Sequence, residues 1–375
     1  MRLIHLTASH FLSLHEVSVD LDAMNVFIGA NASGKSNILN ALRFLAEGLG
    51  RRDFEQAVAE RGGIVHVAWK GEDADEILLE TLYRDGPRVF CWEVRLVRNE
   101  RAFEVEERLQ ETPEDGPPTL LLEARAGQGW WWSAQRKTPL DLPPTGCALA
   151  AAENDASFPA RGVAQFVRGW GFFDPSANSL RRASLLDDTQ RLDATGRNLA
   201  GRLYRLHEDH PSAYERIIRA VRGVLGVPDD LQFRVSDADG RVYFTQSEQG
   251  LKFRVHQVGA SSGTLRMLAL MTALFGEAGY GLVGIEEPEN HVHPAALAAF
   301  AQYLREASGN VQVLVTTHSP LLLDHLAVPE AVCVVRRTED GTSIERESNP
   351  EAVRKALDES GFGLGEFYES KGFGR

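Results

Sequence analysis

The chain has 375 residues, 43% of them hydrophobic and 25% charged, which is enough to bury a sizeable core in one large domain or two ordinary ones. No run of about 18 apolar residues occurs, which excludes a membrane-spanning helix, and the first residues resemble a strand rather than an export signal. The three scattered cysteines fit buried apolar positions in a reducing compartment. We therefore expect a cytoplasmic protein with no membrane partner.

The formal net charge of −13 disfavours a protein that coats nucleic acid along its whole length, because phosphate contacts need Lys and Arg. Between Arg161 and Leu225, however, 11 Arg stand against 7 Asp or Glu. A solvated helical surface is the simpler interpretation of this segment. The alternative is a local basic face that includes Arg181, Arg182 and Arg191.

The first predicted elements are strands followed by a helix. Short β-like segments fill residues 1–20, and the apolar run Met24–Ile28 predicts a buried strand. After a glycine-containing loop, Ile38, Leu42 and Leu45 recur at the spacing of an amphipathic helix. The loop therefore connects a buried strand to a helix.

This loop carries the pattern Gly-x4-Gly-Lys-Ser at residues 29–36. Its glycines let the backbone curl so that N–H groups point at phosphates, and the helix adds its positive N-terminal dipole. Lys35 is expected to reach the β- and γ-phosphates, and the Ser36 hydroxyl is expected to bind Mg²⁺. The predicted nucleotide-binding residues here are Gly29, Asn31, Gly34, Lys35, Ser36 and Asn37. The loop alone does not separate a GTPase, a kinase and an ABC ATPase.

An antiparallel meander is predicted next, from three segments that alternate apolar and polar side chains: 76–85, 89–99 and 102–110. Residues 111–144 are rich in Pro and Gly and predict an irregular excursion with one more strand. We expect the three consecutive Trp residues, 130–132, to pack within the fold, with stacking on bases or on a partner as the alternative.

The second half begins with helices. Residues 192–227 show helical spacing around His210-Pro211, and strands are expected near Phe233 and Val242. The last third alternates strands and helices, at 282–285, 295–307, 311–316 and 331–336. Apolar strands with helices between them indicate a parallel sheet covered on both faces, in which ligands bind at the carboxyl ends of the strands.

Polar side chains follow two of these strands. We expect Glu286 to hold Mg²⁺ or its water shell, and Glu287 to orient and polarise an attacking water. The next strand ends at His318, whose imidazole can hydrogen-bond a γ-phosphate. Each signal is weak by itself, because adjacent acids and a histidine after a strand are common structural features.

One further motif precedes the helix expected around Leu268. In the sequence Ala-Ser-Ser-Gly-Thr at residues 260–264, Ser261 and Gly263 offer a hydroxyl and bare N–H groups to an anion. A simple serine N-cap is the alternative interpretation.

In the order phosphate loop, signature, acidic strand, histidine, these motifs resemble those of the ABC ATPases, in the branch of the SMC, Rad50 and RecF heads and of the ATPase part of OLD nucleases. The similarity is closest to AAA-type ABC ATPases, through Ser262–Arg266, Glu286–Pro294 and Thr316–Pro320. It implies an α/β fold in one ABC ATPase domain, with a mixed β-sheet core, an antiparallel β subdomain and a helical lobe that carries the signature. The expected parts are a phosphate-loop core (1–70), a β-rich insertion (71–160), the helical lobe (161–265) and the core with the acidic strand and histidine (266–375).

The resemblance also implies a mechanism. ATP and Mg²⁺ are the expected cofactors, and Glu287 and His318 are the expected catalytic residues of ATP hydrolysis. The expected partner is a second copy, in a head-to-tail homodimer where Ser261 and Gly263 of one subunit cap the γ-phosphate held by the other. Residues 290–293 occupy the dimer seam in this family, and a metal site at His291 and His293 is the minor alternative.

Three features depart from the family pattern. Glu286 stands where most ABC proteins have Asp. The glutamine of the Q-loop is not placed, with Gln165 and the stretch 170–175 as candidates. The Arg that contacts the base in some relatives is missing from Ser9-His10-Phe11-Leu12, so adenine recognition is unassigned.

No sustained heptad run supports a coiled coil, and the residues after His318 are too few for the Toprim domain of OLD nucleases. We therefore expect a motor without a recognisable effector. The first hypothesis is an ATP-driven switch that works with nucleic acid or a nuclease partner in DNA repair or phage defence. The alternative is an ATP-gated dimerisation module that regulates a protein effector without contacting DNA. A transporter motor is disfavoured by the form of the signature.

Overall fold

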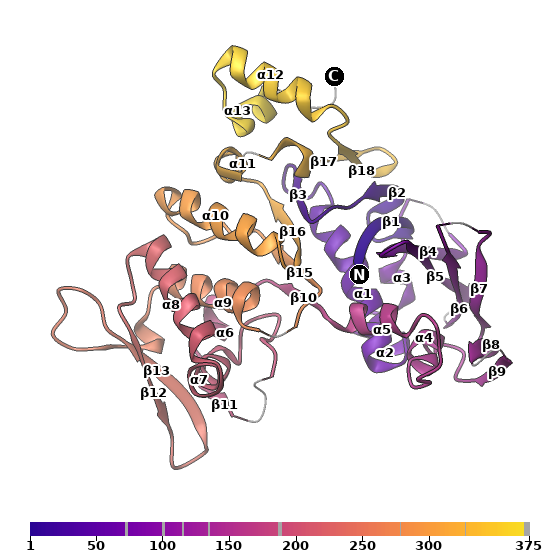
Figure 1. Cartoon of the computed structure of the whole chain (residues 1–375), viewed down its shortest axis with the longest axis horizontal. Helices are drawn as coiled ribbons and strands as arrows, with labels where there is room; N and C mark the ends of the chain where they lie inside the picture. Colours follow the sequence, from indigo (N-terminus) through magenta and orange to yellow (C-terminus); the bar gives the residue numbers. More distant parts are fainter. Residues whose placement is uncertain are drawn as a thin grey trace. The chain divides into compact units, whose positions relative to one another are not determined.

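The computed structural model describes residues 1–71, 74–99, 102–114, 116–133, 136–186, 190–277, 279–326 and 328–370. The chain divides into two compact units (Figure 1). The first unit comprises Met1–Trp170 and Ala331–Ser348, and the second comprises Gly171–Glu330 and Asn349–Arg375. Among the described helices, none is both long enough and apolar enough to cross a lipid bilayer.

An eight-stranded antiparallel sheet dominates the first unit, in the order β2-β1-β4-β5-β6-β7-β8-β9. Its strands are β1 (Arg2–Phe11), β2 (Leu14–Asp20), β4 (Glu76–Asp85), β5 (Arg88–Asn99), β6 (Ala102–Thr112), β7 (Thr119–Arg125), β8 (Gln128–Ser133) and β9 (Arg136–Asp141). In β4 and β5 buried residues alternate with more accessible ones, as in strands that cover a core with one face. The predicted meander is confirmed by the antiparallel pairing of β4, β5 and β6.

The prediction of a single strand between residues 111 and 144 was wrong, because β7, β8 and β9 extend the meander there. Pro139 lies in β9, the edge strand of the sheet, where proline is tolerated. The three Trp residues are half-buried in β8 and contact their own unit, as expected. The Trp131 indole N–H donates to Asp155 at 3.2 Å, and the rings of Trp130 and Trp132 meet edge to face at 6.1 Å.

A smaller group of strands in the first unit surrounds the phosphate loop. Strand β3 (Met24–Ile28) is buried along its whole length and pairs in parallel with β17 (Val332–Thr338), which forms a hairpin with β18 (Gly341–Arg346). Helix α1 (Lys35–Arg51) follows the loop and buries the predicted apolar face. The other helices of this unit are α2 (Glu55–Ala59), α3 (Ile64–Val67), α4 (Ala148–Ala152) and α5 (Arg161–Arg168).

The second unit contains the strands β10 (Trp170–Phe173), β15 (Leu282–Glu286) and β16 (Gln312–Thr317), adjacent in that order. Strands β15 and β16 are parallel, as predicted. Helix α9 (Ser262–Phe275) contacts β15, and α10 (Leu297–Ser308) contacts β16. The carboxyl ends of β15 and β16 therefore meet at one edge of the sheet.

The remaining helices of the second unit form two groups. One group is α6 (Ala177–Leu180), α7 (Leu199–Asp209) and α8 (Pro211–Leu225), which accompanies short strands. The other is α11 (Pro320–Leu326), α12 (Pro350–Ser360) and α13 (Leu364–Glu369), in which α11 contacts α10 and α13. The short strands are β11 (Ser184–Leu185), β12 (Leu231–Val235), β13 (Arg241–Gln246) and β14 (Val255–His256). The strands expected near Phe233 and Val242 are thus confirmed, paired as β12 and β13.

Candidate functional site

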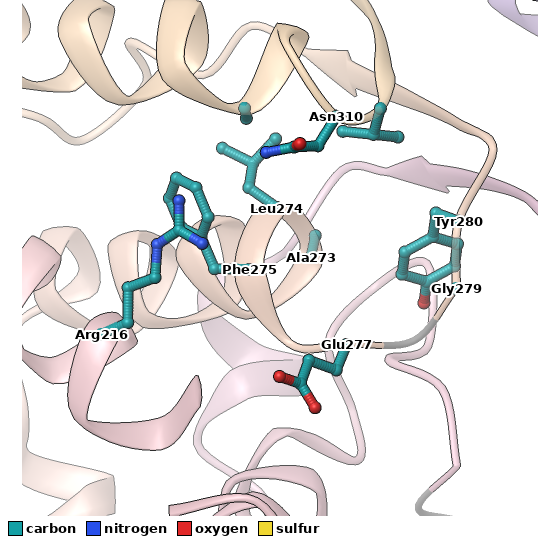
Figure 2. A pocket seen from close by; sticks show the side chains of 10 residues that line it. Arg216, Ala273, Leu274, Phe275, Glu277, Gly279, Tyr280 and Asn310 are labelled. Carbon is teal, nitrogen blue, oxygen red and sulfur yellow. The ribbon is translucent and has the colours of Figure 1, made fainter. Parts of the chain in front are cut away.

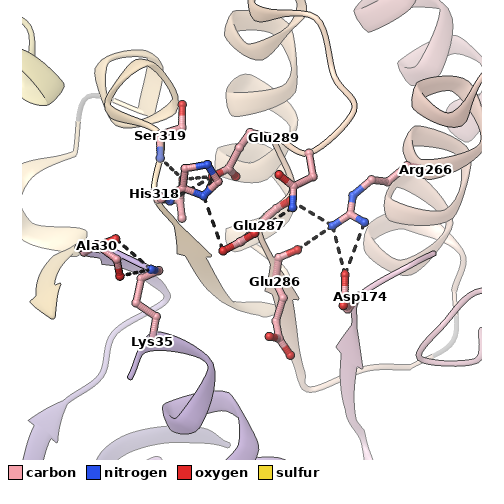
Figure 3. Close-up of polar contacts among 12 residues, drawn as sticks. Ala30, Lys35, Asp174, Arg266, Glu286, Glu287, Glu289, His318 and Ser319 are labelled. Carbon is pink, nitrogen blue, oxygen red and sulfur yellow. Dashed lines mark hydrogen bonds and ion pairs between the residues drawn. The ribbon is translucent and has the colours of Figure 1, made fainter. Parts of the chain in front are cut away.

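The phosphate loop curls between β3 and α1. Gly34 has a φ of 106° and Ala32 a φ of 61°, the left-handed values that bend the backbone over the start of the helix. Lys35 is 5% exposed, and its ammonium donates to the carbonyl oxygens of Gly29 at 2.9 Å and Ala30 at 2.8 Å (Figure 3). The six residues predicted for this loop therefore lie together, and the Lys35 side chain is hydrogen-bonded to the backbone of the loop.

The loop fits a phosphate group. Within the described part of the chain, the N–H groups of Ala32, Gly34 and Ser36 donate no hydrogen bond. The Ser33 hydroxyl is buried and also has no partner there. Open donors at a helix N-terminus favour an anion, and the half-buried Ser36 hydroxyl supplies the kind of oxygen that Mg²⁺ prefers.

Two hydroxyl residues outside the motif support the loop. Ser13 Oγ and Thr342 Oγ1 lie 2.7 Å apart although 329 residues separate them, and the Thr342 hydroxyl also bonds the Ser33 carbonyl at 3.1 Å. A side chain on Gly34 would collide with the Thr342 hydroxyl. Asn37 donates to Ser13 Oγ at 2.7 Å, so its side chain supports the loop. Its contact with a nucleotide stays a prediction.

The acidic pair lies at the end of β15. Glu286 is the last residue of the strand, and Glu287 follows it with a left-handed φ of 43°, a strained value for a residue with a side chain. The Glu287 N–H donates to the Thr316 carbonyl at 2.9 Å, and its carboxylate accepts a 2.8 Å hydrogen bond from Asn290 Nδ2. The predicted base is therefore aimed by the backbone and by a neighbouring amide.

His318 lies between two carboxylates (Figure 3). Its Nδ1 is 3.6 Å from Glu287 Oε1 and 3.5 Å from Glu289 Oε1. The Glu289 side chain is 7% exposed and accepts hydrogen bonds from the Thr317 hydroxyl at 2.6 Å and from the His318 N–H at 3.1 Å. From the sequence, Glu289 was considered only beside His291 and His293 in the minor metal-site alternative, although it is the third acid of the Glu-Glu-Pro-Glu run. The structure thus brings both predicted catalytic residues together and adds a buried carboxylate that orients one of them.

Arg266 was also missed as a site residue. It is 4% exposed, and one Nη donates to the carbonyl oxygens of Glu286 at 2.8 Å and Glu287 at 3.0 Å. The other Nη donates to the Pro175 carbonyl at 2.6 Å, and Asp174 lies 3.4 Å away (Figure 3). The Ser-x-Gly-Thr-Leu-Arg pattern, which ends at Arg266, was the signal in the sequence that could have identified it. Arg266 fixes the backbone from which both acids project.

The signature residues lie at the start of α9. Ser261 is the N-cap, and its hydroxyl accepts a 3.0 Å hydrogen bond from the Thr264 N–H, so the structural alternative holds for this side chain. A Cβ on Gly263 would approach the His291 carbonyl oxygen to 2.6 Å. Glycine therefore lets the 290–293 segment pack directly against the first turn of α9.

The two candidates for the Q-loop lie in different environments. Gln165 lies exposed on α5, while Asp174 and Pro175, after β10, contact Arg266. In the first unit His15 stacks on Trp69 with ring centroids 4.0 Å apart, beside Gly341 and the start of β18. Both rings are half-buried, and His15 lies two residues after Ser13, which supports the phosphate loop.

The alternative of a basic face within residues 161–225 stays a prediction, and Arg216 is one of its arginines with partners in its own unit. Arg216 covers the ring of Phe275 at 4.2 Å and pairs with Glu306 at 2.6 Å. Figure 2 shows Arg216 beside a cavity of about 250 Å³ at the end of α9, which contains none of the predicted site residues. A second cavity, of about 670 Å³, is lined by ion pairs on the large sheet and contains none either.

No group of three or more His, Cys, Asp or Glu side chains in the described ranges has the arrangement of a metal site. His293 accepts a 3.2 Å hydrogen bond from the Ala295 N–H through Nδ1, in the manner of an N-cap. The carboxylate of Glu286 is half-buried at the strand end, where it can contribute an oxygen ligand beside others.

Comparisons with known proteins agree with this geometry. The DNA replication and repair protein RecF of Lactobacillus acidophilus is 51% identical over 47 residues, which is 12% of this chain and only 12% of that protein. A crystal structure of an SMC head bound to the C-winged helix domain of ScpA matches 94% of this chain and 100% of its own at 14% identity, with a TM-score of 0.57. An SMC head with an extended coiled coil, bound to the C-terminal domain of ScpA derived from Pyrococcus furiosus, matches 96% and 99% at 13% identity, with a TM-score of 0.54.

The two SMC structures show the fold, and the fold class predicted from the motifs is thereby confirmed. A family model described as "AAA domain, putative AbiEii toxin, Type IV TA system" matches residues 24–324, far more than half of the chain. The chain therefore belongs to this family, and its fold is that of the SMC heads.

Proposed function

We propose that the chain hydrolyses ATP and that ATP joins two copies head to tail, with hydrolysis releasing them. The observation that carries this proposal is the arrangement of Glu287, His318 and Glu289 at the ends of two parallel strands. A carboxylate and an imidazole at this distance suit activation of water and contact with a terminal phosphate. The open N–H groups of the phosphate loop, in the first unit, support the binding of a phosphate.

Each residue has a distinct role in this mechanism. Lys35 and the loop N–H groups bind the phosphates. Ser36 and Glu286 would hold Mg²⁺, which neutralises charge on the β- and γ-phosphates when bound. Glu287 orients the attacking water and accepts its proton, while Asn290 holds the second carboxylate oxygen. His318 donates to the γ-phosphate from Nε2, because its Nδ1 faces the two carboxylates.

The second copy completes the site in this proposal. Ser261 and Gly263 of one subunit cap the γ-phosphate held by Lys35 of the other. The packing of Gly263 against the His291 carbonyl supports this, because it places the signature and the 290–293 segment on one continuous surface. ATP then stabilises the closed state, and only this differential affinity can drive such a switch.

We consider two kinds of partner for this ATP-driven switch. The similarity to RecF, a DNA replication and repair protein, supports a role with nucleic acid or with a nuclease partner, in repair or phage defence. The alternative is a protein effector without DNA contact, and the SMC heads bound to ScpA domains support that type of partner. Pull-down from native cells, with and without a non-hydrolysable ATP analogue, separates the two. Recovery of nucleic acid or of a nuclease supports the first, and recovery of another protein without nucleic acid supports the second.

The core mechanism is tested with two variants. Glu287→Gln is expected to bind ATP and to accumulate as a dimer on size-exclusion chromatography, because binding remains while hydrolysis stops. Ser261→Arg is expected to bind ATP as a monomer but to lose hydrolysis and dimerisation. Normal turnover by Glu287→Gln would contradict the role of the base. Hydrolysis by isolated monomers of the wild type would contradict the shared site.

A further inference from the structure

Arg181 follows α6 and contacts the loop that leads into α9. Its Nε donates to the Val258 carbonyl at 3.1 Å, and one Nη donates to the Ala260 carbonyl at 3.2 Å and to the Ser262 hydroxyl at 3.1 Å. The guanidinium therefore lies beside Ser261 and Gly263, the two residues proposed to cap a phosphate. The contacts are all within the second unit.

A second set of hydrogen bonds fixes the same place. Gln257 is fully buried, and its Nε2 donates to the Leu180 carbonyl at 2.7 Å and to the Arg182 carbonyl at 3.0 Å. The residues on both sides of Arg181 are thus tied to the signature loop. The guanidinium is held at the start of α9 without needing to order itself when a ligand arrives.

The charge of Arg181 has no ion-pair partner among the described residues. Its hydrogen-bond acceptors are all neutral. The first turn of α9 contains no acid, and the N–H groups of Ser262 and Gly263 donate to no described residue. A cation at the positive end of a helix dipole is unfavourable unless an anion is near. The place is therefore positively charged and open to an anion.

We propose that Arg181 is a further phosphate-binding residue of the composite site, and that it contacts the triphosphate held by the phosphate loop of a second copy of this chain. This inference rests on the proposed ATP-dependent pairing. A guanidinium binds phosphate oxygens through several charge-assisted hydrogen bonds, and the second Nη of Arg181 has no acceptor among the described residues. The same cation therefore orients the signature loop and attracts its ligand.

The first test uses the hydrolysis-deficient Glu287→Gln chain, with ATP-dependent dimerisation measured by analytical ultracentrifugation. Adding Arg181→Gln is expected to weaken the dimer by about 10- to 100-fold, the range for losing charge-assisted hydrogen bonds, while the monomer binds ATP unchanged. Arg181→Lys keeps the charge but loses the fork of donors, so its dimer affinity is expected to lie between those of the wild type and Arg181→Gln. The exposed neighbour is the matched control, since Arg182→Gln should leave dimerisation unchanged.

An unchanged dimer in Arg181→Gln overturns the inference. So does an Arg181→Lys chain as weak as Arg181→Gln, because that result assigns the loss to the loop contacts rather than to the charge. If Glu287→Gln alone forms no dimer with ATP, the proposed function itself fails.

Mixed subunits test the trans arrangement. Lys35→Ala chains mixed with Ser261→Arg chains are expected to regain ATPase activity, because one of the two sites in the mixed dimer carries neither change. Lys35→Ala mixed with Arg181→Gln should recover in the same way. Recovery in the first mixture but not in the second contradicts the placement of Arg181 in trans, whereas failure in both contradicts the shared site.

Discussion

The phosphate loop in the first unit and the acidic strand end in the second are built in opposite ways. The loop binds through its backbone, and its shape depends on glycines that let it pass close to Thr342. The strand end acts through side chains, and their positions depend on the buried Arg266 and Glu289. A backbone site can therefore be recognised in eight consecutive residues, whereas a side-chain site needs supports that lie elsewhere in the chain.

The largest effect is expected from replacing Arg266, which supports the side chains at the end of β15. Arg266→Met leaves three carbonyl oxygens without their charged donor, and we expect about 3–5 kcal/mol lower stability of the second unit. Arg219→Met is the control, because Arg219 is exposed on α8. Chemical denaturation measures both. A loss as small as that of the control would show that the strand end holds its own shape.

The dependence of the phosphate loop on its backbone shape is tested by replacing Gly34. Gly34→Ala combines a φ of 106° with a collision against Thr342, and we expect ATP affinity to fall at least ~100-fold. Gly50→Ala in the same helix meets nothing within 4 Å and should bind ATP normally, with slightly higher stability. Calorimetric titration with ATP measures the affinities. Unimpaired binding by Gly34→Ala would mean that the loop tolerates a different curl.

Among the described residues, each unit buries one carboxylate, Glu107 in the first and Glu289 in the second, and these extend the comparison. In the first unit Glu107 accepts hydrogen bonds from the Ala148 N–H at 2.5 Å and the Leu149 N–H at 3.1 Å. Burial raises the pKa of Glu107 from 4.5 to about 7. The folded state therefore binds more protons than the unfolded state between these values, so its stability falls as the pH rises through this range.

We expect Glu107 to lower the free energy of unfolding by about 2 kcal/mol between pH 5 and pH 8. Glu107→Gln should flatten that dependence, because the amide does not titrate. Thermal unfolding of both chains across the pH range is the measurement. An equally steep dependence in Glu107→Gln would assign it to other groups.

The smallest effect is expected at Glu289, the buried carboxylate beside His318. Glu289→Gln keeps an acceptor for the Thr317 hydroxyl but loses the charge that faces Nδ1, so kcat should fall about tenfold with ATP affinity unchanged. In a His318→Ala background the same substitution should have no further effect on kcat. An additional loss there would show that Glu289 acts through the fold rather than through the imidazole.

Much of the fold followed from local patterns. The alternation in 76–110 and the apolar periodicity after the loop predicted the meander and α1, because each pattern arises from burial of one face. The strands between 111 and 144 were missed, since Pro and Gly in a peripheral sheet give the composition of a loop. Among the site residues, all those named by the motifs lie at the predicted strand ends, loop and helix start.

The sequence by itself determined the phosphate loop, the acidic pair, His318 and the signature, because their spacing to a strand or helix is short and fixes their local geometry. Only the tertiary structure determined which other residues hold these groups in place. Thr342 reaches the loop from more than 300 residues away, and the roles of Arg266 and Arg181 depend on carbonyl oxygens that no pattern of side chains reveals. Backbone acceptors are present at every residue, so only folding selects the ones that a buried cation binds.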